Sequence, residues 1–82
     1  MNTSIRPLIT EKAVMLIEAQ NTLTFLSDKE MTKPEMKKEI EHIFKVKVSK
    51  IRVLIKGNQK YFYVRLKPEF QAIDVATKIG MI

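Results

Sequence analysis

The stretch VSKIRVLIKGNQKYFYVRLK, residues 48–67, decides the fold. Apolar and polar side chains alternate on both sides of Gly57-Asn58, a pattern typical of two antiparallel strands joined by a tight turn. We expect strands over residues 48–55 and 61–67, with one side of the pair facing the core. The side chains predicted to lie in the core are Ile51, Val53, Ile55, Phe62, Val64 and Leu66.

The opposite side of this predicted hairpin carries cations and tyrosines. Because side chains alternate across a strand, that side would present Lys50, Arg52, Lys56, Tyr61, Tyr63, Arg65 and Lys67. Cations neutralise phosphates and tyrosine rings stack on unpaired bases, so the combination favours RNA. An alternative explanation is that the cations discourage pairing at an exposed strand edge, while the tyrosines reflect strand propensity.

Positive charge is concentrated in the same region. Eight of the 15 basic residues lie within residues 45–67, which contain no Asp or Glu. The other residues hold seven basic and nine acidic side chains, so the net charge of +6 comes from this segment. A localised positive field attracts polyanions. The residues predicted to contact RNA are Arg6, Lys12, Lys45, Lys47, Lys50, Arg52, Lys56, Lys60, Tyr61, Tyr63, Arg65 and Lys67. The second hypothesis is a small basic interaction module that binds an acidic protein partner with the same surface.

The remaining elements can be placed by their caps and apolar spacing. Thr10 begins a first helix after the extended Arg6-Pro7 dipeptide, and a strand over residues 22–26 buries Leu23 and Phe25. Residues 32–35, TKPE, form a capping box before a second helix whose apolar residues are Met36, Ile40, Ile43 and Phe44. A terminal helix follows, with apolar residues Ala72, Ile73, Val75, Ala76 and Ile79, and is closed by Gly80. This order predicts an α+β fold, a small two-layer or three-layer sandwich of helices on a largely antiparallel sheet.

Composition excludes several classes of protein. The 82 residues are expected to form a single RNA-binding domain over residues 1–82 with a small core. Without cysteine there is neither a disulfide framework nor a thiolate metal site, and no metal-ligand spacing or phosphate-binding glycine loop is present. We therefore expect no metal and no cofactor. Apolar runs are too short to span a bilayer, and residues 1–10 lack a signal-peptide core, so a cytoplasmic protein is predicted.

Catalysis has little support in the sequence. An enzyme of this size would depend on His42, Asp74 or Glu69, and the sequence contains no arrangement that activates any of them. Helix pairing and helix solubility explain Glu35, Glu39 and Glu41 more simply than a carboxylate site does. We predict that the chain is not an enzyme and has no catalytic residues.

Several segments together resemble a known family. Residues 6–13 (RPLITEKA), 21–25 (NTLTF), 32–41 (TKPEMKKEIE) and 44–48 (FKVKV) are similar to ribosomal protein 23 of the large subunit, in a short form like that of archaea. The resemblance runs nearly end to end. It implies an α+β fold and a structural role in translation as part of a ribonucleoprotein, with neighbouring large-subunit proteins and large-subunit ribosomal RNA as partners.

The resemblance also implies a position and a docking role. Family members bind ribosomal RNA beside the mouth of the polypeptide exit tunnel, where they help to receive signal recognition particle and other factors. The glutamate of the family's Ser/Thr-Glu-Lys motif corresponds to Glu11, which is the predicted factor-docking residue. Bacterial relatives carry a long extension into the tunnel, whereas residues 56–60 here barely turn the chain. Direct contact with nascent peptide deep in the tunnel is therefore not expected.

Overall fold

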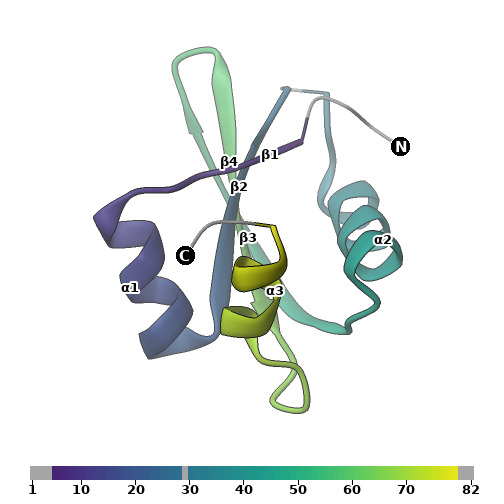
Figure 1. Ribbon diagram of the computed structural model, residues 1–82. Helices are drawn as coiled ribbons and strands as arrows, with labels where there is room; N and C mark the ends of the chain where they lie inside the picture. Colours follow the sequence, from purple (N-terminus) through teal and green to yellow (C-terminus); the bar gives the residue numbers. More distant parts are fainter. Residues whose placement is uncertain (1–4, 29, 80–82) are drawn as a thin grey trace.

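The computed structural model describes residues 5–28 and 30–79 and has the predicted α+β fold (Figure 1). Its elements are β1 (Arg6–Pro7), α1 (Glu11–Gln20), β2 (Thr22–Ser27), α2 (Lys33–Phe44), β3 (Val48–Lys56), β4 (Gln59–Leu66) and α3 (Ala72–Lys78). The order is the predicted one, with β1 added where only an extended dipeptide was expected. The predicted closure of the last helix by Gly80 falls outside the described residues. No helix within the described ranges is long and apolar enough to cross a membrane.

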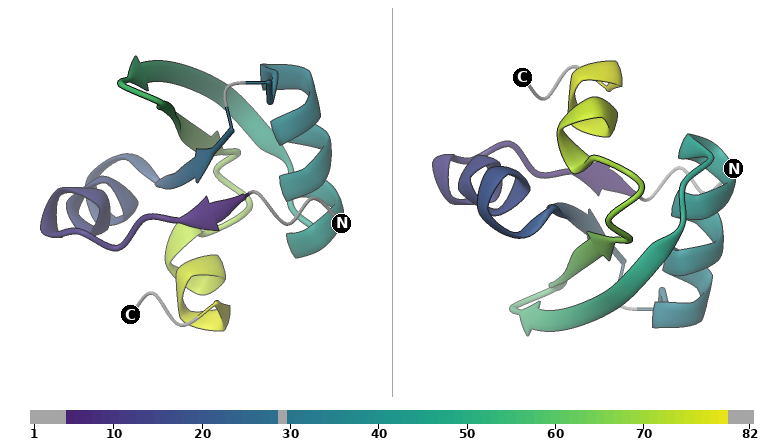
Figure 2. Two further views of the ribbon diagram at one scale, coloured as in Figure 1. Left: turned by 90° about the horizontal axis from the view of Figure 1, so that it is seen from above. Right: turned by 90° about the horizontal axis from the view of Figure 1, so that it is seen from below.

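The four strands form one antiparallel sheet in the order β1-β2-β4-β3. In this order β4 lies between β2 and β3, and β3 forms one edge of the sheet. The two longer helices, α1 and α2, lie on opposite sides of the molecule, and α3 lies between them (Figures 1 and 2). Contacts join α2 to β3 and β4, and α1 to β2 and α3. The helices therefore leave much of the β3–β4 hairpin uncovered.

One side of the sheet, which we call the inner face, carries the hydrophobic core. Leu23, Phe25, Phe62, Val64 and Leu66 are each at most 2% exposed, as the alternation predicts. Helix residues complete the core, namely Ile17, Met36, Ile40, Ala72, Val75 and Ala76. The β3 residues Ile51 and Val53 are half-buried and pack against this cluster. Strand alternation therefore predicts the β4 part of the core better than the β3 part.

The prediction that Ile55 lies in the core is wrong, because its side chain is 59% exposed. Ile55 points to the inner face but pairs with Lys60 near the tip of the hairpin. The tip projects beyond the helices (Figure 1). Since β3 is also an edge strand, no element among the described residues covers this position. Strand alternation gives the direction of a side chain, while its burial depends on what lies opposite.

The hairpin tip is built around Gly57. Its φ angle is +63°, and a side chain on its Cα would meet no other atom within 4 Å. A two-residue turn with glycine at positive φ in its first central position has the type II′ pattern, which matches the twist of antiparallel strands. Backbone conformation, not crowding, is therefore the reason for glycine at this position.

Side-chain caps begin both long helices as predicted. The Thr10 hydroxyl accepts a hydrogen bond of 3.1 Å from the Ala13 N–H at the start of α1. At α2, the Glu35 N–H donates to the Thr32 hydroxyl and the Thr32 N–H donates to the Glu35 carboxylate, which completes a capping box. The hydrogen bonds from the backbone and side chain of Thr32 lower the pKa of the Glu35 carboxyl below its usual value.

Asn21 joins α1, the end of β4 and α3. It ends α1 in the left-handed conformation, with φ of 53°, which asparagine tolerates better than most residues. Its side-chain oxygen accepts a hydrogen bond of 2.7 Å from the Ala72 N–H at the start of α3. Its side-chain nitrogen donates to the carbonyl oxygens of Phe70 at 2.8 Å and Leu66 at 3.3 Å. One side chain thus satisfies backbone groups from two distant segments.

Candidate nucleic-acid interface

The side of the sheet opposite the core presents cations and aromatic rings in cross-strand rows. Paired residues of antiparallel strands share a face, so the register gives each row directly. From β2 through β4 to β3, the rows are Thr22–Arg65–Lys50, Thr24–Tyr63–Arg52 and Leu26–Tyr61–Leu54, and Arg6 extends the last row through β1. Nearer the tip, Gln59 pairs with Lys56. The strands therefore gather charges that are far apart in the sequence.

Helix α1 forms a wall beside these rows. Three of its residues, Lys12, Leu16 and Gln20, are four apart in sequence and so lie along one side of the helix. Lys12 and Leu16 line a hollow of about 340 Å³ together with Arg52, Val53, Leu54 and Tyr63. Gln20 lines a second hollow of about 180 Å³ together with Thr22, Lys50, Arg52, Tyr63 and Arg65. None of these lining residues, all within the described part of the chain, is acidic.

We call this surface the basic face and define it by Arg6, Lys12, Lys50, Arg52, Lys56, Tyr61, Tyr63 and Arg65. All eight were predicted from the sequence to contact RNA, and none of them is buried. The structure therefore brings together most of the predicted residues on one side of the molecule.

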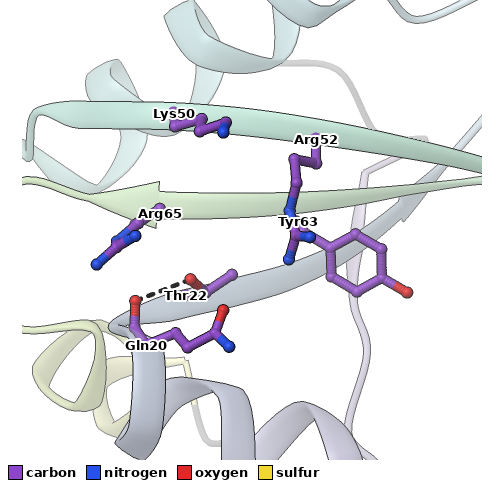
Figure 3. Close-up of a pocket in the computed structure, with 6 residues that line it drawn as sticks. All are labelled: Gln20, Thr22, Lys50, Arg52, Tyr63 and Arg65. Atoms are coloured by element: carbon purple, nitrogen blue, oxygen red, sulfur yellow. Dashed lines mark hydrogen bonds between the residues drawn. The ribbon is translucent and has the colours of Figure 1, made fainter.

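Arg52 and Tyr63 contact each other within the basic face. The guanidinium carbon of Arg52 lies 5.6 Å from the centre of the Tyr63 ring, within the range of a cation–π interaction. Figure 3 shows the Arg52 and Arg65 head groups on either side of Thr22, with the Gln20 side chain running past Thr22. The contact favours positions of the Arg52 group over the Tyr63 ring.

Lys60 is separated from the basic face. Lys60 is two residues before Phe62 in β4, so its side chain lies on the same, inner face of the sheet. There its Nζ donates a hydrogen bond of 2.6 Å to the Met31 carbonyl oxygen. Nζ also lies 5.5 Å from the centre of the Phe62 ring. These contacts give Lys60 a structural role beside the core.

Three other predicted contacts lie at the opposite end of the hairpin from its tip. Lys45 ends α2, and Lys47 and Lys67 are next to each other because the Lys67 N–H donates a hydrogen bond of 3.0 Å to the Lys47 carbonyl oxygen. All three are exposed. They extend the positive surface beyond the sheet, outside the rows of the basic face.

Sequence reasoning missed the contributions of Gln20 and Thr22 to this surface. The Thr22 hydroxyl donates a hydrogen bond of 2.9 Å to the Gln20 carbonyl oxygen, which fixes the end of α1 against the start of β2 (Figure 3). The four-residue spacing of Lys12, Leu16 and Gln20 is visible in the sequence. Its position next to Arg52 is not, because that depends on the pairing of β2 with β4.

One polar group beneath the basic face lacks a partner. Thr24 is 1% exposed, and its hydroxyl has no hydrogen bond within the described residues. Its neighbours in the row are Tyr63 and Arg52. A buried hydroxyl without a partner reduces stability.

The predicted docking residue Glu11 lies in the first turn of α1 and is exposed. Two large apolar side chains near it are also exposed, Ile9 by 58% and Met15 by 60%. Met15 is one turn from Glu11 on the same side of the helix. Glu11 and Met15 are each one position from Lys12 and Leu16, about 100° around the helix, so this exposed strip lies on the side of α1 next to the wall formed by Lys12, Leu16 and Gln20.

No catalytic arrangement is found in residues 5–28 and 30–79. His42 is exposed and lies in the last turn of α2. The Glu41 carboxylate accepts a hydrogen bond of 2.8 Å from the Val48 N–H at the start of β3, and Glu35 belongs to the capping box. The described residues contain no acidic, histidine or cysteine cluster that could hold a metal ion.

A comparison with protein families agrees with this architecture. The family model of ribosomal protein L23 matches residues 2–70, which include all four strands and both long helices. Proteins of this family are structural components of the large ribosomal subunit, with ribosomal RNA and other ribosomal proteins as partners, and the family is not one of enzymes. With more than half of its length matched, the chain belongs to the ribosomal protein L23 family.

Proposed function

We propose that this protein binds large-subunit ribosomal RNA near the polypeptide exit tunnel through the basic face. The observation that supports this most strongly is the gathering of five cations and two tyrosines from β1, β3 and β4, with Lys12 of α1, on the side of the sheet opposite the core. In this role it acts in the cytoplasm as part of the ribosome, and residues 1–82 form the RNA-binding domain.

The mechanism is electrostatic and geometric. Lys50, Arg52 and Arg65 lie in two adjacent rows and neutralise neighbouring phosphates, which releases counterions into solution. Tyr61 and Tyr63 are half-buried, so their rings are held by their surroundings while part of each remains open to ribose or an unstacked base. The contacts to phosphate position the protein, and the rings add stacking.

The test is a double charge reversal, Arg52→Glu with Arg65→Glu, measured by binding to purified large-subunit ribosomal RNA at several salt concentrations. We expect weaker binding and a shallower dependence on salt, by roughly 0.7 to 0.9 in logarithmic slope for each phosphate that the variant no longer neutralises. Both side chains are exposed, so the domain should remain folded.

The matched control is Lys38→Glu with Lys78→Glu, which makes the same change in net charge on exposed positions of α2 and α3. Its salt dependence should stay close to that of the wild type. Equal weakening by both double variants would show that net charge, and not the basic face, determines binding.

The second candidate function is binding of an acidic protein partner by the same cations. Sedimentation of native lysate through sucrose separates the two. Co-migration with the large subunit at high salt that disappears on ribonuclease treatment supports RNA binding. Migration in a nuclease-resistant complex supports the protein partner.

We also propose that the exposed strip of α1 helps to dock signal recognition particle or other exit-site factors. Glu11 offers a carboxylate to a basic partner, and Ile9 and Met15 offer apolar area beside it. The strip lies on a different side of α1 from Lys12 and Leu16, so RNA on the basic face leaves Glu11 and Met15 accessible to a factor. Glu11→Lys should reduce recruitment of signal recognition particle to ribosomes carrying the variant without weakening RNA binding, whereas Glu69→Lys, at an exposed position beyond β4, should change neither.

A further inference from the structure

The smaller hollow of the basic face has features of a site for one nucleotide. Its volume of about 180 Å³ is below the roughly 300 Å³ at which pockets for drug-sized ligands begin, so it suits a single base and not a base pair. Six side chains line it, from α1, β2, β3 and β4: Gln20, Thr22, Lys50, Arg52, Tyr63 and Arg65. Three of them are cations, and the other three carry neutral groups that can form hydrogen bonds.

Arg52 provides a flat surface on one side of this hollow. Its guanidinium carbon lies 5.6 Å from the centre of the Tyr63 ring, and both side chains line the hollow. Bases stack on guanidinium planes as well as on aromatic rings. A base placed there would stack on the guanidinium group beside the Tyr63 ring.

Gln20 provides hydrogen-bonding groups at the edge of the hollow. Its side-chain amide makes no hydrogen bond within the described residues, so its donor and acceptor are available to a ligand. The amide of glutamine can pair with a base edge through both groups. Thr22 donates its hydroxyl proton to the Gln20 carbonyl oxygen at 2.9 Å and so keeps the backbone of Gln20 beside the hollow.

The positions of Lys50 and Arg65 complete the site. They are cross-strand partners in the row next to that of Arg52 and Tyr63. Successive residues on one face of a strand are about 7 Å apart. A nucleotide whose base lies on Arg52 can therefore place its phosphate between Lys50 and Arg65, and Figure 3 shows Arg65 on the side of Thr22 away from Arg52.

We propose that this hollow holds one unpaired nucleotide of the bound RNA, with its base stacked on Arg52 and its base edge read by Gln20. The proposal rests on the proposed RNA-binding function and makes it more specific. It assigns Gln20 as a residue that determines base preference, while Lys50 and Arg65 bind phosphate.

The experiment compares a fully paired synthetic RNA hairpin with three versions of it that carry a single bulged nucleotide, which is A, U or C. The measured quantity is the affinity of the protein for each RNA. The wild-type protein should bind the bulged hairpins about tenfold more tightly than the paired one, as stacking of one base predicts. Arg52→Lys keeps the positive charge but removes the planar guanidinium group, so it should remove most of the preference for bulged over paired hairpins. Gln20→Ala should remove the differences among A, U and C. Gln71→Ala, the same substitution as Gln20→Ala at an exposed position outside the basic face, should leave all of these ratios unchanged.

The outcomes separate this proposal from the proposed function. Equal and salt-dependent binding of bulged and paired hairpins by the wild type would overturn the nucleotide site and leave RNA binding by the basic face intact. A bulge preference that survives both Arg52→Lys and Gln20→Ala would also overturn it. Failure to bind any RNA, including purified large-subunit RNA, would overturn both proposals.

Discussion

The inner and outer faces of the β3–β4 hairpin are made by alternate residues of the same two strands, yet they are used differently. On the inner face, Phe62 and Val64 are fully buried against α2 and α3. On the outer face, their neighbours Tyr61, Tyr63 and Arg65 keep exposed area and contribute to the basic face. The difference teaches that stability and binding can be altered separately in this protein, because adjacent residues serve different purposes.

The largest expected effect is on the inner face. Phe62→Ala should lower the free energy of unfolding by about 3 to 5 kcal/mol, because a fully buried ring leaves a cavity. A domain of this size has a total stability of roughly the same amount, so the free variant should be largely unfolded. Urea denaturation followed by circular dichroism measures this. Leu54 lies on the outer face and is 48% exposed, so Leu54→Ala should change the free energy of unfolding by no more than about 0.5 kcal/mol. Similar losses of stability in the two variants would contradict the distinction between the faces.

A smaller loss of stability is expected at Asn21, whose side chain joins the end of β4 to the start of α3. Asn21→Ala removes the hydrogen bonds to Ala72, Phe70 and Leu66 and places alanine at positive φ. We expect a loss of roughly 2 to 3 kcal/mol from these two causes. Asn21→Gly, which accepts the backbone conformation, should lose less, and thermal unfolding of the pair separates the two contributions. A greater loss in Asn21→Gly would contradict this explanation.

The buried Thr24 hydroxyl gives a prediction of the opposite sign. Thr24→Val keeps the shape of the side chain and removes a polar atom without a partner. The free energy of unfolding should rise by about 1 kcal/mol. Thr22→Val is the matched control and should lower stability, because the Thr22 hydroxyl is bonded to the Gln20 carbonyl oxygen. A loss of stability in Thr24→Val would mean that its hydroxyl is bonded in solution.

The smallest effect concerns the cap of α2, which packs on the inner face. Thr32→Ala should cost about 1 kcal/mol by removing the capping box. The hydrogen bonds from Thr32 lower the pKa of the Glu35 carboxyl in the folded protein. The stability that the charged Glu35 contributes is therefore fully present above the usual pKa of a glutamate, and it is lost as the pH falls through the lower pKa of the folded protein.

Unfolding measured between neutral and acid pH tests this dependence. Glu35→Gln has no charge to titrate but keeps a side-chain oxygen that can accept the Thr32 N–H hydrogen bond. Its stability should therefore fall less on acidification than that of the wild type. Identical pH profiles for the two proteins would show that Glu35 does not contribute.

The elements were predictable from the sequence because their signals are local. The capping residues Thr10 and Thr32 and the Gly57 turn each depend on neighbours within a few residues. The exposure of Ile55 was not predictable, since burial depends on where the helices end relative to the strands. Lys60 is two residues from Phe62, so strand alternation predicts that both side chains lie on the inner face. Lys60 was instead predicted to contact RNA because it is charged.

The candidate site was predictable only in part, for a related reason. Residues on β3 and β4 share a local hairpin register, so Arg52 and Tyr63 could be placed on one face. The approach of Gln20 and Thr22 depends on the pairing of β2 with β4, which joins segments about 40 residues apart in sequence. Such pairing is set by the whole fold and leaves no local pattern.

The open space around Gly57 makes the hairpin tip a practical place for protein engineering. A Cβ added at Gly57 would have no described atom within 4 Å, and the entropy of closing a longer loop grows slowly, by about 0.6 kcal/mol for each doubling of its length. An affinity tag or a fluorophore could be added there without disturbing the core or the helices. Such a handle would allow assemblies that contain this protein to be purified or tracked intact.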